Sequence, residues 1–301
     1  LAAIPPGDVR NNYLQLMLSF AQVDNLLLAE KALTFWAKLL QEISKEISHQ
    51  QQQQQQQQLL PHALPPEAIA ALMNLATEQL MMPRVAIPQQ SENDDEDIPV
   101  YFQDYMDYRE FIVQYRSRLS TILRAAASVL PEQALAGAKT RLHAALTAGS
   151  SGGGGSGGVG GGGGGVPEQV KPLMDTAVFL LEAVMKAVWD DKLQNNPARL
   201  ETVAALVEPM FQELLIFKTT HPPLLQSQGQ GLATFAKLCT VRAHLIPSII
   251  TKLLELLATS IPLEGDARGP PPPNPPPTWR EVLHARQSIA TVIVAYTKAA
   301  P

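Results

Sequence analysis

The fold is decided by residues Met174–Ser260, which read MDTAVFLLEAVMKAVWDDKLQNNPARLETVAALVEPMFQELLIFKTTHPPLLQSQGQGLATFAKLCTVRAHLIPSIITKLLELLATS. Their apolar residues recur at steps of three and four, the spacing that places side chains on one face of an α-helix. Turn residues at 195–197 and 221–223 separate the helices. The apolar positions predicted for four successive helices are Val178, Leu181, Val184, Met185, Val188 and Trp189; Val203, Leu206, Val207, Met210, Phe211, Leu214 and Leu215; Leu224, Leu232, Phe235 and Leu238; and Leu245, Ile249, Ile250, Leu253, Leu254 and Leu257.

These helices pair into two hairpins. Val178 and Leu224 open equivalent helices roughly 45 residues apart, which is the period of HEAT-type hairpins. Such a hairpin buries its apolar side only against a stacked neighbour. The sequence therefore predicts an all-α fold, a HEAT-repeat superhelix (solenoid) of antiparallel hairpins. Pro209 should kink or loosen its helix.

The same periodicity continues on both sides of this stretch. We expect Asp24 to cap the second helix and the fourth to be the longest. The predicted helices are Val9–Phe20, Asn25–Ile43, a helix between Pro65 and Pro83, Tyr101–Leu130, Glu132–Ala148 and a last one after Thr278. Because the chain starts at Leu1 and the pattern runs on to Pro301, we expect a fragment of a longer array.

Low-complexity segments interrupt the helices. The glutamine run 50–58 is interpreted as a loop insert; a helix continuing from Ser44 and an aggregation switch are the alternatives. Gly149–Gly165 is almost pure glycine and serine and should form a flexible coil. The proline run 270–277 is interpreted as a stiff spacer, with a ligand for a proline-binding module as the alternative. The predicted organisation is repeats over 1–148, a linker over 149–166 and repeats over 167–301.

Two charged sets are candidates for partner binding. The acidic segment 92–97 is interpreted as a solvated loop or, alternatively, as an arm that contacts a basic partner; its candidate residues are Asp94, Asp95, Glu96 and Asp97. Arg109, Arg116 and Arg124 step by seven and eight, so they share one side of a helix. They either cover the edge of the core with their stems or meet an acidic protein or phosphates.

Composition favours a binding protein over an enzyme. The 301 residues are 46% hydrophobic and 17% charged, with a formal net charge of -5. One cysteine, Cys239, excludes an internal disulfide, and no apolar run approaches the length of a membrane span. The six histidines form no His-Glu-x-x-His pair. Without a Gly-x-Ser-x-Gly elbow, a Cys-x-x-Cys pair or a Gly-Lys-Ser/Thr phosphate loop, we expect no catalytic site, cofactor or metal.

Several stretches resemble one family. They are Asn12–Phe20, Leu33–Leu40, Asp94–Phe102 with the long helix after it, Phe179–Val188 and Leu214–Pro222. Together they resemble the karyopherin-beta exportins, closest to the exportin-five branch, which includes the HASTY-like exportins of microRNA precursors. The glutamine, glycine and proline runs depart from the family pattern.

This resemblance implies a nuclear export receptor that shuttles between nucleus and cytoplasm. It would bind cargo, a short RNA hairpin or a protein, together with the GTP-bound Ran GTPase, and contact nuclear pore proteins as a monomer. RNA cargo would be held through its phosphates and A-form shape. The alternative is a HEAT scaffold that assembles a cytosolic protein complex.

Overall fold

The computed structural model describes residues 8–53, 64–81, 98–151, 170–189 and 196–258, together with 286, 287, 289, 290, 292–294 and 296. Within these ranges the chain forms α-helices and short 3-10 helices and contains no strand. Contacts divide it into two compact units, Leu1–Ala134 and Leu135–Pro301. The all-α prediction is confirmed. The predicted linker start at 149 is wrong, because helix α5, Pro131–Ser151, continues past it. The predicted linker end at 166 stays a prediction, because residues 152–169 lie outside the described part.

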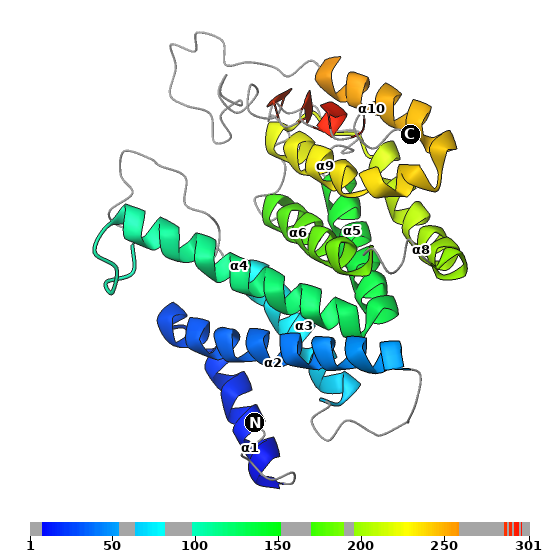
Figure 1. Ribbon diagram of the computed structural model, residues 1–301. Coiled ribbons are helices and arrows are strands. Elements are labelled where there is room, and N and C mark those ends of the chain that lie inside the picture. Colours follow the sequence, from blue (N-terminus) through cyan, green and yellow to red (C-terminus); the bar gives the residue numbers. More distant parts are fainter. Residues whose placement is uncertain are drawn as a thin grey trace, which may run out of the picture. The chain divides into compact units, whose positions relative to one another are not determined.

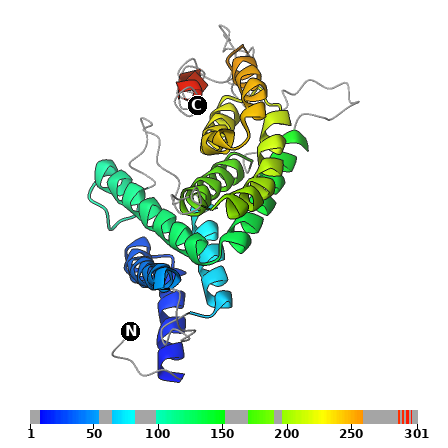
Figure 2. The ribbon, with the colours of Figure 1, turned by 45° about the vertical axis from the view of Figure 1, so that its right-hand side comes forward.

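The first unit is built from four helices and the start of a fifth (Figures 1 and 2). Their bounds are α1 Asp8–Ala21, α2 Leu26–Gln53, α3 Pro66–Met81, α4 Tyr105–Val129 and α5 Pro131–Ser151. Helix α2 packs along α4, α3 packs on α4, and α1 packs on α2. Contacts between consecutive helices and between equivalent helices of successive hairpins are what stacked hairpins produce.

Side-chain caps set where two of these helices begin. The Asn25 side chain accepts hydrogen bonds from the backbone N–H groups of Leu27 (3.0 Å) and Leu28 (3.2 Å). The predicted cap, Asp24, was therefore one residue too early. The Asp104 carboxylate accepts from the Asp107 N–H (2.8 Å), so α4 begins at residue 105 rather than 101. With 25 residues α4 is shorter than α2, which has 28, so the prediction of the longest helix was wrong.

Helix α2 is longer because it continues into the glutamine run. It ends at Gln53, ten residues beyond the predicted end at Ile43. Glutamine has a good intrinsic helix propensity, so a helix already nucleated upstream extends into it at little cost. The loop interpretation is therefore wrong for residues 50–53. The rest of the run lies outside the described residues.

A buried polar chain joins three helices of the first unit. The Tyr115 hydroxyl of α4 donates to Gln79 Oε1 of α3 (3.1 Å). Gln79 Nε2 in turn donates to the carbonyl of Ala21, the last residue of α1 (3.2 Å). Gln79 is 1% exposed and Tyr115 is fully buried. Since a helix end leaves carbonyls without intrahelical partners, Gln79 satisfies one of them from inside the core.

The second unit contains the stretch from which the fold was predicted. Beyond α5, its elements are α6 Val170–Val188, α8 Pro197–Ile216, α9 Pro222–Thr234, the 3-10 helices η3 Ala236–Thr240 and η4 Ala243–Leu245, and α10 Ile246–Ala258. Helix α6 packs on α9, and α8 packs on both α9 and α10. The pairs α6 with α9 and α8 with α10 are those that the repeat period makes equivalent.

The predicted apolar positions were mostly but not all correct. Helix α8 continues through Pro209, which is exposed. Leu238 belongs to η3 rather than to the third helix. On α10, Ile250 and Leu254 are 45% and 56% exposed, whereas Leu256 and Lys252 are buried. Periodicity alone could not orient this helix, because apolar residues occupy adjacent positions at 249 and 250, 253 and 254, and 256 and 257.

Gly149 has a packing role that the sequence did not reveal. It was predicted to begin a coil, but it lies in the last turn of α5. A Cβ atom there would stand 2.9 Å from Cζ of Phe217, which is 5% exposed. Only a residue without a side chain allows this ring to approach the helix.

Alanine should act in opposite directions at the two glycines of α5. Gly137→Ala meets nothing within 4 Å, so the higher helix propensity of alanine should raise the free energy of unfolding by about 0.5–1 kcal/mol. Gly149→Ala should lower it by about 1–3 kcal/mol, because Phe217 must shift. Urea denaturation of both variants measures the difference. Stabilisation at both positions would show that the ring moves freely.

Candidate partner-binding surfaces

The three candidate arginines lie on one helix whose opposite side is in the core. Helix α4 buries Tyr108, Ile112, Tyr115 and Leu119 among others. Arg109 and Arg124 are exposed, whereas Arg116 is half-buried and has a partner within the protein. The predicted stripe therefore exists, with two solvent-facing guanidinium groups. The acidic candidates Asp94 to Asp97 lie outside the described residues, so their role stays a prediction.

A fourth arginine of α4 is part of an ion-pair cluster instead. Arg118 lies 3.7 Å from Glu30 of α2, and Lys31 lies 3.1 Å from the same carboxylate. Partial burial by itself raises the pKa of Glu30. Hydrogen bonds from Thr34 and Lys31, with the charges of Lys31 and Arg118, outweigh it and lower the pKa overall. This cluster joins α2 to α4 and leaves the stripe to the other three arginines.

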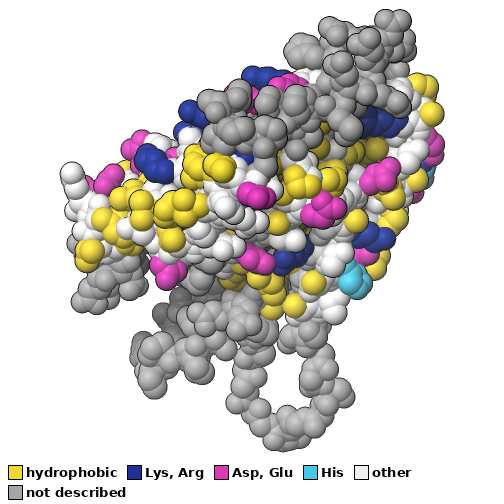
Figure 3. Space-filling view, turned by 90° about the horizontal axis from the view of Figure 1, so that it is seen from below, with side chains coloured by type: hydrophobic (Ala, Val, Ile, Leu, Met, Phe, Trp, Pro, Cys, Tyr) yellow, Lys and Arg dark blue, Asp and Glu magenta, His cyan; other side chains and the backbone are white. Residues whose placement is uncertain are grey.

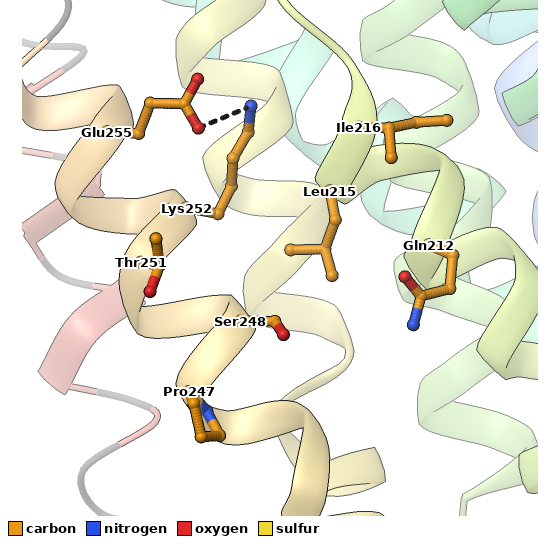
Figure 4. Close-up of a pocket in the computed structure, with 8 residues that line it drawn as sticks. All are labelled: Gln212, Leu215, Ile216, Pro247, Ser248, Thr251, Lys252 and Glu255. Atoms are coloured by element: carbon orange, nitrogen blue, oxygen red, sulfur yellow. Dashed lines mark ion pairs between the residues drawn. The ribbon is translucent and has the colours of Figure 1, made fainter.

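The second unit has an open groove that the sequence analysis missed (Figure 4). Its volume is about 430 Å³. It is lined by Gln212, Leu215 and Ile216 of α8 and by Pro247, Ser248, Thr251, Lys252 and Glu255 of α10. Apolar, hydroxyl, amide and charged groups are mixed along it.

Lys252 of this groove is engaged in holding helix α8. Its ammonium donates to the carbonyl of Phe217 (2.9 Å), and Gln228 Nε2 donates to the carbonyls of Leu214 (2.7 Å) and Phe217 (3.0 Å). Glu255 lies 3.6 Å from the ammonium, and the lysine side chain is only 6% exposed. A cation at a helix carboxyl end is favourable, but burial lowers the pKa of Lys252. We therefore interpret Lys252 as a structural cap.

Arg242 holds the segment between α9 and α10 against α8. It donates from Nε to Glu208 (3.1 Å) and from both terminal nitrogens to Glu201, at 2.9 Å for Nη1. The hydrogen bond from Arg242 lowers the pKa of Glu201, and the bond to Glu201 raises the pKa of Arg242. Glu201 is exposed, and its partner Arg242 is 41 residues away. Nothing in the local sequence indicates that pairing.

Among the described residues, the Cys239 thiol and the side chains that could bind a metal form no reactive site. Cys239 is 2% exposed, and burial raises the pKa of its thiol to about 11, so it stays protonated near neutral pH. Among the described residues, no three His, Cys, Asp or Glu side chains come together as metal ligands. In the same residues no helix has the length and apolar character needed to cross a membrane.

Comparison with known proteins decides the family. The family model described as Exportin-5 family matches residues 5–301, nearly the whole chain. The chain belongs to the Exportin-5 family. A search of curated proteins finds no match to it. The resemblance inferred from the sequence is thereby confirmed. Members of this family are transport receptors rather than enzymes, so family membership indicates a nuclear export receptor.

Proposed function

We propose that this chain contributes to a nuclear export receptor that binds cargo together with GTP-bound Ran and carries it through the nuclear pore. The match to the Exportin-5 family over residues 5–301 carries the proposal. Stacked hairpins support it physically, because they present extended surfaces for macromolecules rather than an enclosed reaction site. The receptor would shuttle between nucleus and cytoplasm, with contacts to pore proteins and without membrane insertion.

The proposed cargo is a small structured RNA such as a microRNA precursor, a protein, or both. On the face shown in Figure 3, acidic and basic side chains are interspersed among apolar ones. The whole sequence carries a net charge of -5. An RNA hairpin needs a basic surface for its phosphates, so any RNA contact would be confined to local basic sites such as the α4 arginines. This mixture of charges supports contacts with a protein cargo at least as well as contacts with RNA.

Capture by Ran tests the proposal directly. Immobilised Ran locked in its GTP form should retain the protein, and the GDP form should retain much less. The same capture is repeated with a microRNA-precursor hairpin at several salt concentrations, since phosphate contacts give a steep loss of affinity with salt. Absence of nucleotide-dependent capture would favour the scaffold alternative. A flat salt response would remove RNA from the proposed cargo.

A further inference from the structure

We draw no further inference here: the strongest candidate, the open groove between α8 and α10, is an unpartnered surface of mixed polar and apolar side chains, and nothing in the structure shows what covers it.

Discussion

Replacing Lys252 by glutamate should lower the free energy of unfolding by about 3–5 kcal/mol, the range found when a buried charge loses its partner. In the native protein the ammonium donates to the Phe217 carbonyl and lies 3.6 Å from Glu255. A carboxylate there would face a carbonyl oxygen, a second carboxylate and the negative end of α8. Chemical denaturation measures the loss. Lys139→Glu, at an exposed position in the middle of α5, is the control and should stay within about 0.5 kcal/mol.

Lys252→Met should show how much the buried charge costs. The measurement is the free energy of unfolding of the wild type and of this variant as a function of pH. Burial lowers the pKa of Lys252 in the folded protein below its ordinary value of 10.5. Between these two values the unfolded chain binds the proton and the folded protein does not. Stability from this group therefore rises with pH across that window, and the cost is present in full below it.

The comparison must be a difference between two curves. Burial raises the pKa of Cys239 to about 11 and also raises that of Tyr296. The contribution of these two groups to the free energy of unfolding therefore falls as pH rises. The free energy of unfolding of the wild type minus that of Lys252→Met cancels their contribution. We expect this difference to rise with pH up to about 10.5, the unfolded pKa. A flat difference would show that Lys252 titrates as it does in water.

Gln79→Leu should destabilise the first unit by about 2–4 kcal/mol, because each buried polar group that loses its partner costs about 1–3 kcal/mol. The substitution removes the bond to the Ala21 carbonyl and the acceptor of the Tyr115 hydroxyl together. Leucine has a similar volume, so the effect should come from hydrogen bonding rather than from a cavity. Asn74→Leu, at an exposed position of the same helix, should change stability by less than about 0.5 kcal/mol.

A double-mutant cycle separates the two bonds of this polar chain. Tyr115→Phe removes only the hydroxyl and leaves Gln79 Oε1 without that donor. In the double variant Gln79→Leu/Tyr115→Phe, neither partner of that bond remains. The loss should then be smaller than the sum of the two single losses. Strict additivity would indicate that the two side chains do not depend on each other.

Much of the fold follows from local sequence. Steps of three and four located α1, α3 and α10 to within a few residues and gave the later parts of α6 and α8, and the repeat of roughly 45 residues predicted which helices would stack. The proline pair at 65–66 placed the start of α3 correctly. Pro197, Pro222 and Pro223 were predicted as turn residues, but they form the first turns of α8 and α9, where a missing N–H costs nothing. Less was predictable for the candidate surfaces. The helical spacing placed Arg109, Arg116 and Arg124 on one side of α4, but it could not show which of them solvent reaches.

The sequence by itself determined that the chain is a stack of helical hairpins of the exportin type, because helix periodicity and repeat length depend only on neighbours along the chain. Only the tertiary structure decided which polar side chains are buried or paired and which groups they bind. Gln79 with the Ala21 carbonyl, Lys252 with Phe217 and Arg242 with Glu201 are pairs 35 to 58 residues apart. Their partners come within reach only after the helices pack. A long-range hydrogen bond depends on a distance in space, and no spacing in the sequence encodes that distance.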